Sequence, residues 1–393
     1  MTGRVPRSAR ARSLLRSAAF VSTFDRFAMP PMLVAVAVEF DASLVSVVNA
    51  AGVYFLAYGL MQPVWGLASD RIGLVRTMRL TLLLAAVATV AGTFATSPWS
   101  WGVARGLTGA CFSAAIPAAL IYLGDTVPAP LRQREIAGLM TGVAVGTALA
   151  SASAGVLAQY TSWKVPFLVT GAVTVLLVIA LRRLPEPPRS RAGQPVSASW
   201  GRVWRSRPAR LVLLLVFVEG AALLGAFTLI PPAVEAAGAS TTVAGAVTAA
   251  YGVAVLLAAP LVGRMSRRTP TSHLIVLGAA AATLACVLVA VSRTPAVAVV
   301  GAALLGVGWA AMHSSLQTWA TEVLPEARSL VVSLFAGALF LGSAVGTVSV
   351  GELAGAGRYQ GIYWGAAALC LVLGVCASRG RADWRRSEGG PSG

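Results

Sequence analysis

Four charged residues interrupt long apolar stretches of this sequence: Asp25, Arg26, Arg105 and Glu219. A charge at the centre of a membrane-spanning helix costs roughly 2.5 to 3.5 kcal/mol on insertion scales, so such residues are rare there and generally serve function. We expect Arg105 to pair with Asp25, and all four residues to be candidates for proton coupling, with Asp25 and Glu219 as the acids that take up and release protons. A static ion pair that only holds helices together is the alternative for Asp25 and Arg105.

Aromatic and amide side chains recur in the apolar stretches that would surround a central cavity. Aromatic faces suit apolar or cationic ligands, and a few polar groups fix a ligand's orientation. Packing within the bundle or anchoring at the membrane interface is the alternative for each of these side chains. The candidate substrate contacts are Phe24, Phe27, Tyr54, Tyr58, Gln62, Phe227, Tyr251, Trp309 and Gln317.

The sequence offers little for enzymatic chemistry. It has no Gly-Lys-Ser/Thr phosphate loop, no metal-ligand spacing of cysteine and histidine, and no nucleophile beside a base. His273 and His313 lie far apart, and we expect His313 to be a hydrogen-bonded buried residue. We therefore predict no enzyme activity, no cofactor and no metal. The cysteines, expected to be apolar filler, are Cys111, Cys286, Cys370 and Cys376.

The elements that position these residues follow from composition. The chain has 393 residues, of which 57% are hydrophobic and 11% charged, and no water-soluble domain of this size stays in solution with that composition. Because a spanning helix needs about 20 mainly apolar residues, we predict an all-α membrane protein with twelve transmembrane helices. The predicted spans are residues 14–36, 44–68, 77–96, 98–123, 134–158, 163–182, 209–232, 240–264, 271–292, 295–319, 328–352 and 358–378.

The formal net charge of +17 would favour nucleic acid binding in a soluble protein. Here all but five of the 31 basic residues fall in the termini or in alternate loops on one side of the predicted spans. Cytoplasmic loops of membrane proteins carry such an excess of arginine and lysine. We therefore predict a multi-pass protein of the bacterial inner membrane, with both termini in the cytoplasm, membrane lipids as neighbours and no nucleic acid partner.

The sequence also divides into two related halves. Pro63 and Pro128 recur as Pro260 and Pro325 at a single offset. Six spans per half give the two copies the same orientation and a pseudo-twofold axis along the membrane normal, about which two bundles can rock around a central site. The expected organisation is a six-helix bundle at 1–183, a cytoplasmic linker at 184–208 that contains either an interfacial amphipathic helix or a disordered basic segment, and a second six-helix bundle with a basic tail at 209–393.

The stretch from Gly66 to Arg76 reads Gly-Leu-Ala-Ser-Asp-Arg-Ile-Gly-Leu-Val-Arg. It resembles the signature of the major facilitator superfamily, in which glycine, three residues, Asp-Arg, one residue and glycine precede a basic cluster. The resemblance implies a latch that shuts the cytoplasmic side in the outward-facing state. Asp70 could accept hydrogen bonds from a helix N-terminus, and an arginine of this stretch could pair with Asp125 or Glu135. The expected gate residues are Gly66, Asp70, Arg71, Gly73, Arg76 and Asp125.

Two further segments bear on the branch of that superfamily. Arg105 and Gly109 resemble its second motif, which implies that the arginine tunes the protonation of a carboxylate during transport. The motif of proton-driven antiporters would place proline after Gly146, where this sequence has Thr147. The segment from Trp163 to Phe167 nevertheless looks like a turn that is common in the drug-efflux branch.

Together these features predict a monomeric secondary transporter that exports a small organic molecule, either a drug-like compound or a metabolite, by proton-coupled alternating access. Proton-coupled import of a small nutrient is the first alternative, and a non-transporting receptor or scaffold is the alternative from another class. Since the chain has no nucleotide-binding loop, the driving force would be ionic.

Overall fold

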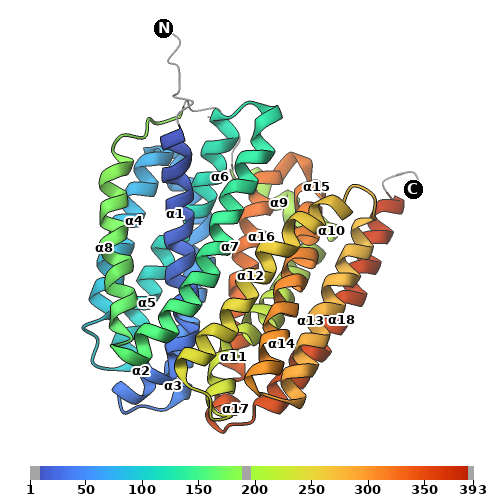
Figure 1. Ribbon diagram of the computed structural model, residues 1–393. Coiled ribbons are helices and arrows are strands. Elements are labelled where there is room, and N and C mark those ends of the chain that lie inside the picture. Colours follow the sequence, from blue (N-terminus) through green and yellow to red (C-terminus); the bar gives the residue numbers. More distant parts are fainter. Residues whose placement is uncertain (1–8, 188–195, 388–393) are drawn as a thin grey trace.

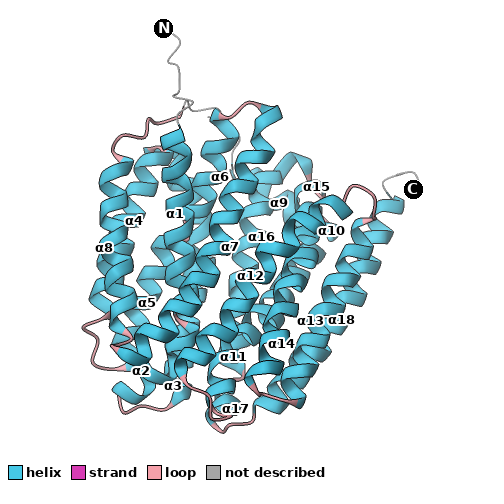
Figure 2. Ribbon diagram, viewed as in Figure 1, coloured by secondary structure: helices cyan, strands magenta, loops and turns pink. Residues whose placement is uncertain are grey.

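The computed structural model describes residues 9–187 and 196–387, and this part of the chain is helical without any strand (Figure 2). Twelve of its helical segments are long and apolar enough to cross a membrane, which confirms the predicted number of spans. The first half contains α1 (Ala9–Ala28), the 3-10 turn η1 (Pro30–Met32), α2 (Leu33–Glu39), α3 (Leu44–Ile72), α4 (Leu74–Gly92), α5 (Pro98–Phe112), α6 (Ala115–Thr126), α7 (Ala129–Tyr160) and α8 (Lys164–Leu181).

The second half repeats this plan with additional irregular turns. It contains α9 (Val196–Arg205), α10 (Arg207–Glu219), the π-helical turn η2 (Gly220–Leu224), α11 (Gly225–Glu235), α12 (Thr241–Met265), α13 (Thr271–Val291), α14 (Pro295–Gly308), the π-helical turn η3 (Trp309–His313), α15 (Ser314–Glu322), the 3-10 turn η4 (Pro325–Ala327), α16 (Arg328–Ser349), α17 (Gly351–Gly355) and α18 (Tyr359–Ser387).

Serine side chains mark several helix starts. Ser43 and Ser240 each accept a hydrogen bond from the backbone N–H three residues later, and Ser97 forms a reciprocal capping box with Ser100. These caps satisfy backbone donors that the first helical turn leaves without partners. The starts of α3, α5 and α12 therefore follow from local sequence.

The segment that carries the superfamily signature, expected to be a loop, is almost entirely helical. Helix α3 continues through Gly66 and Asp70 to Ile72, and α4 begins at Leu74, so Gly73 alone joins them. Gly73 has φ of 106° and ψ of 149°, a conformation that is essentially confined to glycine. The predicted loop is thus a one-residue corner between two spans.

The two halves form two bundles side by side. Figure 1 shows α1–α8, in blue to green, in one bundle and the later spans, in yellow to red, in the other. Helix α1 begins and α18 ends at the same end of the molecule. We call this end, where the basic loops also lie, the basic end, and the other the opposite end.

The bundles touch mainly toward the opposite end. Near that end, a Cβ built on Gly155 of α7 would lie 2.9 Å from the backbone of Gly245 of α12, and at the middle of the spans one on Gly59 of α3 would lie 2.7 Å from the carbonyl oxygen of Gly337 of α16. Toward the basic end, a Cβ on Gly66 would meet no atom within 4 Å. The helix pairs α7–α12 and α3–α16 therefore close the opposite end and diverge toward the basic end.

Of the two forms expected for the linker, the helix is present as α9, which ends at Arg205. Val203 is fully buried, whereas Trp204 on the same short helix is 55% exposed. Ser206 ends the segment and caps α10 by accepting a hydrogen bond from the N–H of Ala209. One face of α9 thus packs on the protein and the other carries an exposed tryptophan.

Candidate functional site

Asp25 of α1 and Arg105 of α5 form a buried ion pair. Arg105 Nη2 lies 2.6 Å from Asp25 Oδ2, and Nη1 lies 3.1 Å from Oδ1. The side chains are 2% exposed for the arginine and 0% for the aspartate. The geometry is bidentate, the arrangement in which arginine binds a carboxylate most strongly. The pairing expected from the sequence is present in the structure.

Neighbouring side chains complete the environment of this pair. The Arg105 guanidinium lies 4.8 Å from the ring centroid of Tyr54 and 4.4 Å from that of Phe167. Thr89 of α4 donates a hydrogen bond of 3.5 Å to Asp25 Oδ1. Both carboxylate oxygens of Asp25 are therefore occupied by donors in this conformation, and the aromatic faces add cation–π attraction.

Arg26, the residue next to Asp25, has a different environment. Its guanidinium lies 4.9 Å from the ring centroid of Phe27, 5.3 Å from that of Tyr58 and 5.1 Å from that of Phe340. Arg26 is 8% exposed, and its Nε is buried without a hydrogen-bond partner. Within the described ranges no carboxylate lies at ion-pair distance from Arg26. The site therefore holds a buried positive charge that lacks an anion, where the two bundles meet.

Glu219, the last residue of α10, is fully buried and pairs with His313. The distance from Glu219 Oε2 to His313 Nδ1 is 3.0 Å, while Glu219 Oε1 is buried without a partner among the described residues. The His313 ring stacks on Trp309, with centroids 3.9 Å apart and planes 11° apart. This confirms the expectation that His313 is hydrogen-bonded, and it gives Glu219 a partner that the sequence analysis did not name.

Both members of this pair adjoin π-helical turns. Glu219 directly precedes η2, and His313 is the last residue of η3. Such turns widen the helix by one residue and are frequent at functional sites. In the second bundle, η2 and η3 thus adjoin the two residues that form one carboxylate–imidazole pair.

Three of the predicted substrate contacts form an aromatic cluster between the bundles. Phe27 lies 5.4 Å from Phe227 and 6.0 Å from Tyr251, and the last two rings are 4.5 Å apart. Phe27 belongs to the first bundle and its two partners to the second. Together with Arg26, this cluster closes the space between the bundles toward the opposite end.

The remaining predicted contacts are more dispersed. Tyr54 and Tyr58 stack at 6.0 Å and are buried, as is Gln62 one turn later. Phe24 packs against Phe20 of its own helix. Trp309 stacks on His313, as described above, whereas Gln317 is exposed on α15 toward the basic end.

The corner at Gly73 is stabilised by a residue that the sequence analysis did not select. Glu186 accepts hydrogen bonds from the backbone N–H groups of Val75 (3.0 Å) and Arg76 (3.3 Å), and thereby caps α4. A Cβ at Gly73 would lie 2.9 Å from the Glu186 carboxylate. The acid expected to accept bonds at a helix N-terminus, Asp70, is exposed on the last turn of α3, so the linker supplies the cap instead.

Glu135 also has partners other than those expected. Its carboxylate lies 3.2 Å from Arg16 Nη2 and 3.6 Å from Arg12 Nη1, both on α1. Of the two acids considered as partners for Arg71 or Arg76, Glu135 is thus bound by arginines of α1, and pairing with Asp125 stays a prediction. The reason is geometric: the start of α7 lies against α1, and α1 carries two arginines at helical spacing toward its basic end.

The turn before α8 is bound to Glu39, the last residue of α2, by a hydrogen bond and an ion pair. Trp163 Nε1 donates a 2.6 Å hydrogen bond to Glu39, and Lys164 Nζ lies 2.6 Å from the other oxygen of that carboxylate. The turn therefore joins two segments at the opposite end.

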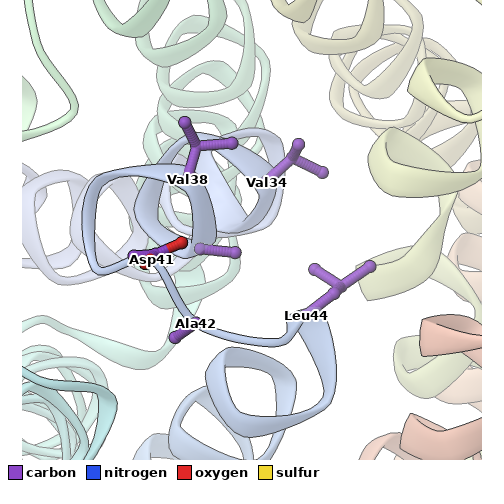
Figure 3. A pocket seen from close by; sticks show the side chains of 6 residues that line it. Val34, Val38, Asp41, Ala42 and Leu44 are labelled. Atoms are coloured by element: carbon purple, nitrogen blue, oxygen red, sulfur yellow. The ribbon is translucent and has the colours of Figure 1, made fainter.

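A surface pocket near the same end lies outside this site. Its volume is about 410 Å³, and its walls come from α2, the turn after it and the start of α3. Figure 3 shows Val34 and Val38 projecting from one helix, with Asp41 at the turn and Leu44 beyond it. Asp41 is its only charged side chain, and none of the residues described above lines it. This pocket is a feature of the turn and not of the central site.

Two bundles of six spans, related by sequence repeat and with buried charges where they meet, are an architecture typical of secondary transporters. The chain belongs to the Major Facilitator Superfamily, whose sequence profile matches residues 16–325 and 225–390. Membership of this superfamily indicates a transporter of small molecules and not an enzyme.

Among curated proteins, the chain is similar to the hexuronate transporter of Escherichia coli (strain K12), with 30% identity over 138 residues, covering 35% of this chain and 32% of the relative. It is also similar to the gallate transporter of Pseudomonas putida, with 29% identity over 153 residues, covering 39% of this chain and 34% of the relative. The matched part spans about a third of each relative.

Solved structures share the fold over nearly the whole chain. A single-residue variant of the nucleoside transporter NupG superimposes with a TM-score of 0.79 at 14% identity, covering 94% of this chain and 99% of that chain. A bacterial homologue of the lysosomal transporter Spinster, in an inward-facing and unoccupied conformation, gives a TM-score of 0.72 at 16% identity, covering 95% and 98%. At these identities the likeness shows the fold alone.

Proposed function

We propose that this protein transports a small organic anion bearing a carboxylate, with Arg26 as the residue that binds its charge. The observation that carries the proposal is the buried guanidinium of Arg26, enclosed by Phe27, Tyr58 and Phe340 without a carboxylate partner among the described residues. A buried charge is costly unless it is paired, so a site that leaves one unpaired favours a ligand of opposite charge.

The names of the curated relatives support this substrate class. Hexuronate and gallate, after which the two similar transporters are named, both carry a carboxylate on a small polar ring. A ring of that kind would pack on the aromatic faces around Arg26 while its carboxylate paired with the guanidinium.

We further propose that substrate moves together with protons. Moving one negative charge inward against an inside-negative membrane potential costs about 2.3 kcal/mol per 100 mV, and one accompanying proton removes that cost. The Glu219–His313 pair is the proposed proton carrier, because Glu219 Oε1 is without a partner and both oxygens of Asp25 are already bound by donors. In this proposal, binding of the substrate carboxylate to Arg26 affects the neighbouring pair of Asp25 and Arg105, and through it the packing of α1 on α5 in the first bundle.

Proton-driven export is the second candidate function. It is favoured by the tryptophan turn at Trp163, which resembles that of the drug-efflux branch, and it would use the same central site with opposite coupling. Its substrate would be exchanged for protons, so accumulation would occur on the more acidic side of the membrane.

The test is transport by the purified protein in proteoliposomes. Labelled hexuronates and aromatic carboxylates are offered with a pH gradient of either sign, and accumulation with the proton gradient supports symport, whereas accumulation against it supports export. Arg26→Gln should weaken carboxylate affinity at least about thirtyfold, since loss of one partner of a buried charge pair costs about 2 to 5 kcal/mol. Arg358→Gln, at an exposed loop arginine, is the matched control.

Two outcomes would overturn the proposal. One is transport of neutral sugars or nucleosides in preference to every carboxylate, and the other is unchanged carboxylate affinity in the Arg26 variant. Absence of flux for any solute in either gradient would favour the receptor alternative instead. Glu219→Gln should abolish accumulation driven by the pH gradient while leaving counterflow exchange of substrate, which separates proton coupling from substrate binding.

A further inference from the structure

A second charged cavity lies at the basic end, between the first turns of α1 and α7. Its volume is about 640 Å³, and it is separate from the central residues described above. We call it the arginine pocket. The residues that line it are Arg12, Ser13, Arg16, Ser17, Phe20, Leu131, Arg134, Glu135 and Gly142.

Helical periodicity brings these side chains together. On α1, Arg12, Arg16 and Phe20 follow one another at intervals of four, which places them on one face. On α7, Glu135 and Gly142 are seven residues apart and share the facing side. Each helix thus contributes one row of side chains to the pocket, polar near the basic end and apolar or small one to two turns further into the membrane span.

The pocket keeps a surplus of positive charge. Its three arginines face one acid, Glu135, which contacts Arg12 and Arg16 and is only 13% exposed. The two arginines keep 40% and 46% of their side-chain surface exposed, and Arg134 is exposed without an ion-pair partner in the described part of the chain. The net charge of the lining is therefore positive, and its donors remain accessible.

The backbone of α7 is shaped to admit one of these arginines. The guanidinium of Arg16 lies directly over Gly138, in space that a Cβ at this position would share with the end of that flexible side chain. One turn further, a Cβ at Gly142 would lie 3.7 Å from the carbonyl oxygen of Arg16, an ordinary contact distance that a methyl group could occupy. The Arg16 guanidinium, paired with Glu135, therefore lies over a face of α7 that carries glycine at two positions one turn apart.

We propose that the arginine pocket binds the headgroup of an anionic phospholipid. Basic pockets between transmembrane helices on the cytoplasmic side bind acidic headgroups, because phosphate pairs with arginine while the acyl chains remain in the bilayer. The apolar surroundings favour a lipid over a soluble anion: Leu131 is 53% exposed, Met140 on the next turns of α7 is 38% exposed, and Phe20 forms part of the wall. A bound headgroup would bridge α1 and α7, which belong to one bundle and reach toward the central site.

The test is binding of phosphatidylglycerol and of phosphatidylcholine to the purified full-length chain, measured by native mass spectrometry. Arg16→Gln with Arg134→Gln should reduce the preference for phosphatidylglycerol about thirtyfold, since each arginine near the membrane surface contributes on the order of a tenfold or smaller factor. Arg267→Gln with Arg268→Gln, two exposed arginines after α12 at the same end, is the matched control and should leave the preference unchanged. Gly142→Leu fills the pocket without changing charge and should also reduce binding.

Several results would overturn this proposal. An equal loss of lipid preference in the pocket and control variants would show unspecific adsorption to basic loops. Equal binding of both lipids by the unaltered protein would show that the pocket does not select an anionic headgroup. Displacement of the lipid by millimolar inorganic phosphate would show a free-anion site, and displacement by a transported carboxylate would show a substrate vestibule. Because Arg16 also pairs with Glu135, Arg134→Gln alone and size-exclusion profiles separate lost binding from misfolding.

Discussion

The buried pair between Asp25 and Arg105 allows a quantitative prediction. Both side chains are almost fully buried and share contacts of 2.6 and 3.1 Å. Removing one partner of such a pair leaves an uncompensated charge and costs about 3 to 5 kcal/mol, whereas replacing both partners with neutral groups is close to neutral. Arg105→Gln and Asp25→Asn should therefore each be strongly destabilising, and the double variant should recover most of the loss.

The measurement is a double-mutant cycle on the free energy of unfolding in mixed micelles. The expected coupling energy is about 3 kcal/mol or more. The matched control is the pair of Lys164 and Glu39, which has the same 2.6 Å separation but is 36% and 40% exposed, so its coupling should stay at about 1 kcal/mol or below. Equal coupling in the two cycles, or additive losses at Asp25 and Arg105, would refute the reasoning.

The same double variant separates the two roles weighed for this pair. If the ion pair only holds α1 against α5, the recovered double variant should transport its substrate at the rate of the unaltered protein. If its charges take part in the transport cycle, the double variant should be stable and yet fail to accumulate substrate.

Three further substitutions test other contacts. Gly73→Ala should destabilise the protein by about 1 to 3 kcal/mol in denaturant unfolding, because φ of 106° disfavours a side chain and its Cβ would press on Glu186. Trp163→Phe should cost about 2 to 3 kcal/mol by the same measurement, since the smaller ring leaves a cavity where the indole is buried and the hydrogen bond to Glu39 is lost. Gly245→Val should force α12 away from α7, and spin-label distances across the opposite end should lengthen.

Each of these predictions has a result that contradicts it. Unchanged stability of the Gly73 variant would mean that the corner tolerates a side chain, and Gly124→Ala, at a glycine with nothing within 4 Å, is its control. An unchanged stability of the Trp163 variant would mean that neither the packing of the indole nor its hydrogen bond stabilises the turn. Unchanged distances in the Gly245 variant would show that the two bundles do not meet there.

Much of the fold could be predicted because the governing forces act along the chain. Span number follows from the length of apolar segments. The pair of Asp25 and Arg105 was also predictable, since a charge within a span needs a partner and few acids are available. The superfamily signature was correctly recognised, although Gly66 to Asp70 proved to be helix.

The partners of the other charges were not predictable in the same way. His313 lies 94 residues from Glu219, and Glu186 lies 111 residues from the helix start that it caps. A sequence shows how deep a residue lies in the membrane but not which neighbouring helix its side chain faces. The proline neighbours of Glu186, which fix the chain direction there, were the available signal for its role, and the stripes on α1 and α7 were the signal for Arg16 with Glu135.

The sequence by itself thus determined that twelve apolar helices cross a membrane in two repeated halves, and that a few charges lie within them at a cost that implies function. Only the tertiary structure decided that Arg26 is enclosed by aromatic rings from both halves without an acid, while Asp25 beside it is fully bound. Adjacent residues on a helix point about 100° apart, so their partners are set by the packing of other helices. That packing gives Asp25 a bidentate partner and leaves Arg26 among aromatic rings, although the two residues are adjacent in the sequence.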